Sequence, residues 1–385
     1  MKNYKMDTLL IHGGATTDPR TKAVNFPIYQ TSTYAQQGLG KNFGYEYSRT
    51  KNPTRDAIET LIAELENAKF GFAFASGMAA SSCVFSLFKS GDKILISSNV
   101  YGGTFRVLDK VFSNFKIEYE IVDMRDTKLL ESKINSRVKA IFFETPANPL
   151  MQVVSIKELA KISKKHKILS IIDNTFMTPY LQKPLDLGVD IVVHSATKYL
   201  GGHSDLVAGL IALKDKDLAE KIGFLQNSIG AVLAPFDSFL LVRGIKTLGL
   251  RMQKHCENAL KIAKFLEKHK AIDKVYYPFL ESDVGYAIQK SQAKAGGGMI
   301  SFELNAKYDY KKLCQSTKII VLAESLGGVE SLLCHPASMT HASIPKKIRE
   351  QVGIKENLIR LSVGIEDADD LIQDLNEAIN LAKKS

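Results

Sequence analysis

Short apolar runs alternate with amphipathic stretches from about residue 70 to residue 245. Most of the runs are nearly continuous and β-branched, which is typical of strands buried on both faces. They cover residues 71–75, 93–97, 117–122, 140–143, 168–172 and 190–194. Helical patterns lie between them, for example over residues 78–88 and 156–164. The alternation predicts an α/β fold whose mainly parallel sheet is covered by helices on both faces.

Residues 1–50 lack this periodicity. They are polar and rich in Tyr, Gly and Thr, so we expect an arm rather than a domain. A helix is predicted to begin directly after them, because Asn52 is a favourable N-cap and Pro53 suits the first helical position. Its apolar stripe comprises Ile58, Leu61 and Leu65.

The pattern changes again after Gly244. A long helical pattern over residues 246–269 precedes strand candidates at 273–277, 299–304, 319–323 and 358–363. An amphipathic helix closes the chain, with aspartates near its start and lysines at its end, as the helix dipole favours. We therefore expect an arm (1–50), a larger α/β domain (51–245) and a smaller C-terminal α+β domain (246–385).

Length and composition agree with two or three globular domains. The chain has 385 residues, of which 45% are hydrophobic and 24% charged. These values exclude a disordered chain, a collagen and a coiled coil. Lys and Arg number 51 against 41 Asp and Glu, a net charge of +10. Such a surplus of positive charge indicates binding to nucleic acid, to a membrane surface or to an anionic substrate. The alternative is that the lysines are spread over solvated surface.

A nucleic-acid partner is disfavoured by the distribution of this charge. Binding to a single strand needs a basic patch with interleaved aromatic residues. The best basic run, residues 161–167, fits one solvated helix face, and no RRM, KH or zinc motif accompanies it.

The cysteines and the first residues indicate a cytoplasmic protein. Cys83, Cys256, Cys314 and Cys334 are far apart and form no CxxC pair, so we expect neither a disulfide framework nor a metal site. The N-terminal segment has only a three-residue apolar run, whereas a signal peptide needs about 7–15. No segment approaches the roughly 18 apolar residues of a membrane span, so we expect no membrane partner.

Several common catalytic motifs are absent from the sequence. It has no GxxxxGK[ST], HExxH or GxSxG. The GxGxxxG spacing at 38–44 follows no strand, which disfavours a nicotinamide dehydrogenase.

The most informative block spans residues 168–209. One predicted strand ends in Asp173, and the next is followed by Lys198 with Ser195 and Thr197 just before it. In an open α/β sheet, ligands bind outside the carboxyl ends of the strands. We therefore expect a carboxylate, an amine and two hydroxyls to meet at one edge of the sheet.

This set of groups matches the needs of pyridoxal phosphate. The cofactor aldehyde forms a Schiff base with a lysine, and a carboxylate keeps its ring nitrogen protonated. Its phosphate needs hydroxyls and free N–H groups, which a helix starting at Gly77 would supply. The alternative is that Lys198 is an ordinary surface lysine.

Longer motifs then point to a known family. They are TLLIHGG at 8–14, YEYSR at 45–49, NPTR at 52–55, YGGT at 101–104, ETPANP at 144–149, SLGGVES at 325–331 and LSVGIE at 361–366. With residues 173–205 they resemble the transsulfuration (Cys/Met metabolism) family of pyridoxal-phosphate enzymes along nearly the whole chain. The resemblance implies fold type I, with residues 51–245 as the cofactor-binding domain.

The resemblance also implies roles for individual residues. Lys198 would be the Schiff-base lysine and proton shuttle, Asp173 would pair with the pyridinium nitrogen, and Tyr101 would stack on the ring and assist proton transfer. The phosphate would be bound by Gly77, Met78, Ser195 and Thr197, together with Tyr47 and Arg49 of the neighbouring subunit. The substrate would be bound by Arg360, which grips its α-carboxylate, and by Asn148, Ser325, Arg106, Glu46 and Glu324.

The expected reaction is α,γ-elimination of cystathionine to cysteine, 2-oxobutyrate and ammonia. Glu46 and Glu324 would pair with the distal amine of cystathionine, and methionine γ-lyases tend to be apolar there. The stretch FLQNSIGAV at 224–232 is also similar to γ-lyases. The first alternative is a γ-synthase, which joins an acylated homoserine to cysteine, and the second is a β-lyase. A β-lyase side activity is also compatible with the expected γ-lyase activity. Gly202 departs from relatives that have Asn.

A site shared between subunits implies an obligate dimer. The resemblance further implies a homotetramer built as a dimer of such dimers.

Overall fold

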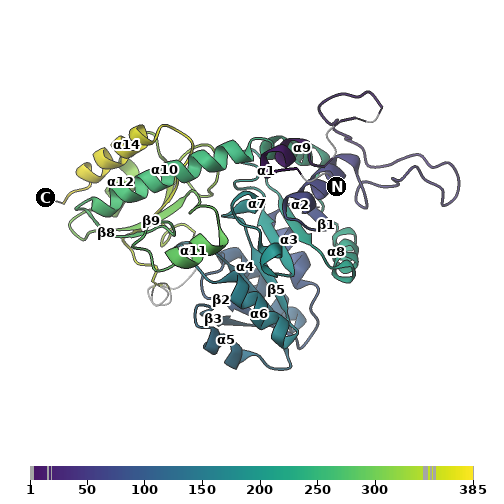
Figure 1. Ribbon diagram of the computed structural model, residues 1–385, viewed down its shortest axis with the longest axis horizontal. Coiled ribbons are helices and arrows are strands. Elements are labelled where there is room, and N and C mark those ends of the chain that lie inside the picture. The colour runs from purple at the N-terminus through teal and green to yellow at the C-terminus, as the bar shows by residue number, and fades with distance from the viewer. Residues whose placement is uncertain are drawn as a thin grey trace.

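The computed structural model of the chain describes residues 4–14, 17–18, 20–340, 346, 349 and 353–384. Two layered bodies lie side by side in Figure 1, and each is built around its own β-sheet. The long helix α10 (Leu248–Lys268) runs along the top of the C-terminal body. Loops from the first 50 residues extend away at the opposite end of the molecule.

The larger sheet has the strand order β1-β7-β6-β5-β4-β2-β3. Among the described strands of this sheet, β7 alone runs in the opposite direction to the others. The predicted mainly parallel α/β sheet is therefore confirmed. The strands are β1 (Phe70–Phe74), β2 (Lys93–Ser97), β3 (Glu118–Val122), β4 (Val138–Glu144), β5 (Leu169–Asp173), β6 (Ile191–Ser195) and β7 (Gly209–Leu213).

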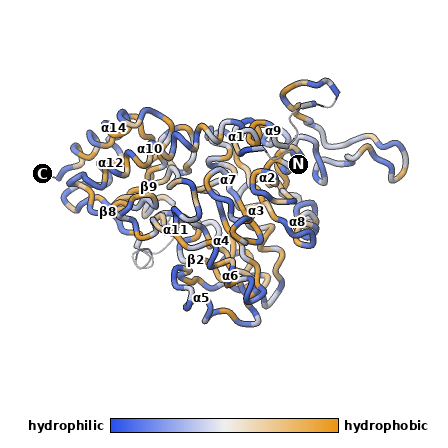
Figure 2. Tube along the Cα trace, viewed as in Figure 1, coloured by the Kyte–Doolittle hydropathy of each residue, from blue (hydrophilic) through white to orange (hydrophobic). Residues whose placement is uncertain are grey.

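Both faces of this sheet are apolar and covered by helices. Leu95 packs into a cluster with α2 (Pro53–Leu65) and α6 (Ile156–His166). Its neighbours Ile94 and Ile96 point the other way, into a cluster with α3 (Gly77–Phe85), α4 (Gly102–Lys110) and α8 (Lys216–Ile229). Figure 2 shows the same layering, with apolar segments turned inward and polar segments outward. The continuous apolar runs in the sequence therefore mark strands that are buried on both sides.

The smaller sheet has the strand order β10-β11-β12-β9-β8. Its strands are β8 (Ile272–Tyr276), β9 (Met299–Leu304), β10 (Val321–Leu322), β11 (Leu332–Cys334) and β12 (Leu358–Ser362). Helices α10, α12 (Tyr310–Ser316) and α14 (Ala368–Leu381) pack on it and complete a second apolar cluster. The remaining described helices are α1 (Met6–His12), α5 (Thr127–Lys133), α7 (Thr178–Leu181), α9 (Pro235–Ile245) and α11 (Tyr286–Gln292), with 3₁₀ turns at Phe112–Phe115 and Pro184–Leu187.

Three elements differ from the sequence-based expectations. Strand β7 was not predicted, because the small residues Gly209 and Ala212 dilute its apolar run. Strand β11 has only three residues, too few to show a period. Helix α1 lies within the stretch expected to be an arm, yet Leu10 is buried in the larger core cluster.

The root of the arm is fixed by Asn52. Its side-chain oxygen accepts a hydrogen bond from the Thr54 N–H, so the predicted N-cap of α2 is confirmed. Its amide group donates to the Tyr29 carbonyl at 3.0 Å, which ties the arm to the same residue. Farther out, Leu39 and Phe43 are exposed, so the arm presents apolar side chains on its outer part.

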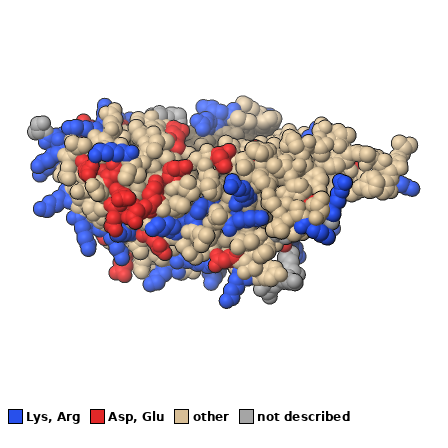
Figure 3. Space-filling model, turned by 90° about the horizontal axis from the view of Figure 1, so that it is seen from above, with Lys and Arg blue, Asp and Glu red and all other residues tan. Residues whose placement is uncertain are grey.

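Surface charge is distributed rather than concentrated. The face seen in Figure 3 carries lysines and arginines interspersed with acidic side chains, which gather on the side of the C-terminal elements. All four cysteines are free and buried. Within the described part of the chain, no helix is long and apolar enough to cross a membrane.

Candidate active site

A cavity of about 380 Å³ lies at the carboxyl ends of the central parallel strands. Strands β4, β5 and β6 end there, and helices α3 and α4 begin there. The C-terminal body contributes β12 and the segment between β10 and β11. The cavity brings together the following residues proposed from the sequence: Gly77, Met78, Tyr101, Asn148, Asp173, Ser195, Thr197, Lys198, Glu324, Ser325 and Arg360.

Asp173 is the last residue of β5. The Thr175 N–H donates to its carboxylate at 3.0 Å, and the Thr175 hydroxyl contacts the same oxygen. Burial raises the pKa of Asp173, while the hydrogen bonds from Thr175 and the charges of His194 and Lys198 act in the opposite direction. These contacts stabilise a half-buried carboxylate that lines the cavity.

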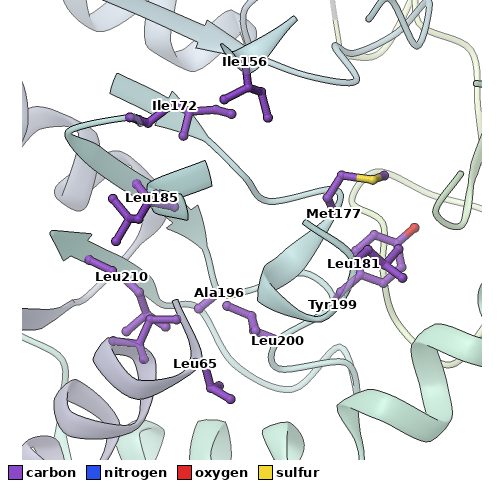
Figure 4. Packing of buried hydrophobic residues seen from close by; sticks show 14 of the residues in the cluster. Leu65, Ile156, Ile172, Met177, Leu181, Leu185, Ala196, Tyr199, Leu200 and Leu210 are labelled. Atoms are coloured by element: carbon purple, nitrogen blue, oxygen red, sulfur yellow. The ribbon is translucent and has the colours of Figure 1, made fainter. Parts of the chain in front are cut away.

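The loop that carries Lys198 is anchored in the core. Ala196, Tyr199 and Leu200 on either side of it are almost fully buried, and Figure 4 shows them among the packed apolar side chains. The ammonium of Lys198 is directed the other way, where its Nζ donates to the Ser325 hydroxyl at 2.9 Å. Packing of its neighbours therefore fixes the position of the amine.

The amine of Lys198 loses its proton more readily than an ordinary lysine. Burial lowers its pKa to about 8, and the nearby positive charge of Arg360 adds to this effect. Glu324 and Asp173 oppose it. A substantial fraction of the amine is therefore neutral near pH 8, and the neutral form is the nucleophile and the base.

Arg360 links the two bodies at the cavity. It lies in the middle of β12, is 3% exposed, and donates to Asn148 Oδ1 and to the Ser325 carbonyl, each at 3.0 Å. Ser325 has φ +83°, a conformation that side-chain-bearing residues rarely adopt. A buried guanidinium with a planar fork is well suited to bind a carboxylate.

The start of α3 forms a close-packed cradle. Ser76 caps the helix by accepting from the Ala79 N–H at 3.0 Å, and the first N–H groups of a helix have no partner within it. A Cβ on Gly77 would lie 2.8 Å from the Ser195 Cβ, so only glycine lets the helix approach this closely. The backbone N–H groups of α3 therefore lie beside the hydroxyls of Ser195 and Thr197, which suits a phosphate group.

Glu144 was missed by the sequence reasoning. It ends β4, lines the cavity, and accepts a hydrogen bond from the Tyr101 N–H at 2.6 Å. Thr175, the main partner of Asp173, was missed as well. Position in the sequence could have indicated both, because Glu144 directly follows the predicted strand at 140–143 and Thr175 comes two residues after Asp173.

Four residues proposed from the sequence lie outside this cavity. Glu46, Tyr47 and Arg49 are exposed on the arm, and Arg106 is exposed on α4. The carboxylate of Glu46 contacts the side chain of Asn42 in the arm itself. The chain thus does not bring its own arm to its own cavity.

Gly202 fills a position where a side chain would not fit. It has φ +75°, and a Cβ there would lie 2.1 Å from an Arg251 guanidinium nitrogen. Arg251 is buried and donates to the carbonyls of Tyr199 and Gly244 at 2.6 and 2.7 Å. A side chain at position 202 would therefore require the Arg251 guanidinium to move.

The residues present fit pyridoxal phosphate. The cavity holds an amine with a lowered pKa, a half-buried carboxylate, and a cluster of hydroxyls at a helix N-terminus. These match an aldehyde, a protonated ring nitrogen and a phosphate. No group of three or more His, Cys, Asp or Glu that could hold a metal ion occurs among the described residues.

Comparison with known proteins gives a family match along nearly the whole chain. A family described as "Cys/Met metabolism PLP-dependent enzyme" matches residues 7–380, where PLP denotes pyridoxal phosphate.

Relatives and solved structures match at high identity. The chain is 58% identical to a cystathionine beta-lyase of Lactococcus lactis subsp. cremoris (strain MG1363), over 97% of this chain and 98% of that protein. It is 52% identical to a cystathionine gamma-lyase of Bacillus subtilis (strain 168), over 97% of this chain and 99% of that protein. A crystal structure of cystathionine gamma-lyase from Lactobacillus plantarum, complexed with L-serine, superimposes with a TM-score of 0.97 at 52% identity, covering 98% and 99% of the two chains.

Proposed function

Since this chain belongs to the Cys/Met metabolism family of PLP-dependent enzymes, we propose that it binds pyridoxal phosphate on Lys198 and cleaves cystathionine at its γ-carbon. The products would be cysteine, 2-oxobutyrate and ammonia. The observation that carries the proposal is the lowered pKa of the Lys198 amine, together with its place between Asp173 and Arg360.

The cofactor would be held by groups at the carboxyl ends of β1, β2, β5 and β6. Lys198 would bind its aldehyde and Asp173 its ring nitrogen. Gly77, Met78, Ser195 and Thr197 would bind its phosphate, with Tyr101 over the ring. When bound, pyridoxal phosphate supplies an electron sink that stabilises negative charge at the α-carbon of the substrate.

The remaining steps are carried by side chains of the protein. Arg360 binds the α-carboxylate of the substrate and so orients the α-hydrogen. The neutral amine of Lys198 would remove the α-proton of the substrate. γ-Cleavage then needs a second proton to be removed at the β-carbon. We assign these proton transfers to Lys198 and Tyr101, which both line the cavity.

The distal part of the cavity favours cystathionine. Glu324 lines the cavity next to Ser325, and Glu46 of a neighbouring arm would add a second carboxylate. Cystathionine carries an amine at its distal end, whereas a methylthio tail carries no charge. A carboxylate forms an ion pair with the distal amine but has no charge to pair with on a methylthio tail.

Cleavage at the β-carbon is a second candidate. It is favoured by the 58% identity to a protein named cystathionine beta-lyase. β-Cleavage needs only the first proton transfer by Lys198 and yields homocysteine, pyruvate and ammonia. The two reactions differ in which amino-acid end of cystathionine Arg360 would bind: the four-carbon end for γ-cleavage and the three-carbon end for β-cleavage.

The test is to give the purified protein, loaded with pyridoxal phosphate, cystathionine alone and to identify the 2-oxo acid by mass spectrometry. We expect 2-oxobutyrate in excess over pyruvate, with equimolar cysteine. Excess pyruvate with homocysteine would replace the γ-assignment by the β-assignment. A parallel tube with cysteine and an acylated homoserine tests the synthase, and faster cystathionine formation there would overturn the lyase assignment.

The exposed position of Tyr47 and Arg49 supports a shared site. Arm residues that lie outside the cavity of their own chain are free to reach that of a second copy. We therefore include a dimer of active-site-sharing dimers in the proposal.

A further inference from the structure

Two carboxyl groups lie side by side at the end of the central sheet. Glu144 ends β4 and Asp173 ends β5, and the parallel register pairs these two residues directly. Residues paired in this way project to the same face, and both side chains line the cavity. Glu144 is 7% exposed, so water screens the pair little.

The partners of the two groups are unequal. Asp173 receives two hydrogen bonds from Thr175, and the positive charge of Lys198 stabilises its ionised form. Glu144 accepts one hydrogen bond, from the Tyr101 N–H. Two adjacent carboxyls, one buried and one half-buried, do not both ionise readily, so the proton stays on the less stabilised one.

The charged groups of the surrounding elements do not reverse this order. They are Lys198 after β6, Glu324 before Ser325, and Arg360 on β12. Arg360 is engaged with Asn148 and Ser325, and Lys198 with Ser325. In keeping with this, burial and the Asp173 charge raise the pKa of Glu144 well above its usual value.

We propose that Glu144 is a positioning residue that carries a proton beside ionised Asp173 and holds the backbone of Tyr101 at the cavity. The inference rests on the proposed cofactor site and adds a residue to it. As a neutral acid, Glu144 accepts from the Tyr101 N–H through one oxygen. It also keeps a second negative charge away from the ring nitrogen, so that Asp173 alone faces it.

This role explains how Tyr101 is oriented. Tyr101 is the N-cap residue of α4, and no side chain caps that helix start. The ring is 45% exposed and is not fixed by burial. The hydrogen bond from its N–H to Glu144 therefore ties α4 to the end of β4.

The test compares E144Q with E144A. Glutamine keeps the shape, the neutrality and the acceptor, whereas alanine removes the bond to Tyr101. We expect E144A to lower kcat about tenfold with little change in KM, as loss of one buried hydrogen bond predicts, and E144Q to recover most of that loss. The pH midpoint of the visible band of the bound cofactor should stay within a few tenths of a unit in E144Q. A midpoint that moves as far in E144Q as in E144A would overturn the proposal, because it would show that Glu144 acts through a negative charge.

A second measurement locates the proton. The infrared difference spectrum of wild type minus E144Q should contain the C=O stretch of a protonated carboxyl, moving to lower frequency in D₂O. A carboxylate band in its place would contradict the proposal. This spectrum decides the matter even if E144A fails to fold, and it does so whether or not the protein cleaves cystathionine. Failure of the proposed function would show separately, as no cofactor uptake or no oxo acid.

Discussion

At the residue scale, the lysine at the centre of the site is defined by its surroundings. Lys198 is one of many lysines in a basic chain, but it is partly buried and the charge of Arg360 lies nearby. Both conditions disfavour the charged form. The pKa falls to about 8 as a result, which gives a direct prediction of pH dependence.

The rate at which the cofactor-free protein takes up pyridoxal phosphate should rise with pH through a midpoint near 8. The reason is that the neutral amine reacts and the ammonium does not. The negative charge of Glu324 raises the Lys198 pKa, so E324Q should move the midpoint to lower pH. Stopped-flow absorbance against pH measures both, and a midpoint near that of an ordinary lysine would contradict the assignment.

Glu324 should also select the substrate. In E324Q, kcat/KM for cystathionine should fall by roughly tenfold, since an ion pair to the distal amine contributes about 1–2 kcal/mol. The value for an S-alkylhomocysteine, which has no distal charge, should change much less. Equal losses on the two substrates would remove the distal-pocket argument.

Much of the site could be predicted residue by residue, but not all of it. Asp173 and Lys198 stand at the ends of recognisable strands, so strand order alone brings them together. Glu144 was not identified, since an acid at a strand end is commonplace and its partner is a backbone N–H. The place of Tyr47 and Arg49 depends on a second chain, so one chain cannot show it.

At the scale of elements, apolar periodicity located most of the sheet. The central strands are buried on both faces and therefore appear as continuous runs, as with β4 and β5. Strand β7 was not predicted, because Gly209 and Ala212 dilute its apolar run, and its pairing with the distant strand β1 leaves no local signal. The three-residue strand β11 was missed as well, because its place depends on pairing with β10 and β12.

The contact between α3 and β6 is the element-level feature that the cofactor needs most. G77A should push the helix away from Ser195, because its Cβ would lie 2.8 Å from the Ser195 Cβ. We expect about 1–3 kcal/mol of destabilisation, as for other overpacked sites, and at least tenfold weaker binding of pyridoxal phosphate.

Fluorescence titration and thermal unfolding measure these two effects. The matched control is G38A, because nothing lies within 4 Å of the Cβ it adds and its backbone is not left-handed. Cofactor affinity in G77A equal to that in G38A would contradict the phosphate assignment.

At the scale of the whole molecule, most of the net charge of +10 lies on the surface rather than at the cavity. Positive side chains are interspersed with acidic ones over the face in Figure 3, and several pair with them, as Lys93 does with Glu120 at 3.1 Å. The cations that matter for function are the few in or near the cavity. The surplus itself is best explained as solvated surface.

Subunit sharing can be tested by complementation. R49A and K198A should each be strongly impaired on its own. Mixed after dissociation, they should recover about a quarter of wild-type activity, because half the dimers are hybrids and each hybrid has one intact site. R360A mixed with K198A is the control and should recover nothing, since Arg360 and Lys198 line the same cavity. No recovery with R49A would place Arg49 in the site of its own chain.

The claim that everything else depends on is that pyridoxal phosphate binds covalently to Lys198. The direct measurement is to load the protein with the cofactor, reduce it with borohydride, digest it and map the modified peptide by mass spectrometry. The account predicts that the phosphopyridoxyl group is found on Lys198. Its presence on another lysine, or its absence from every peptide, would contradict the account.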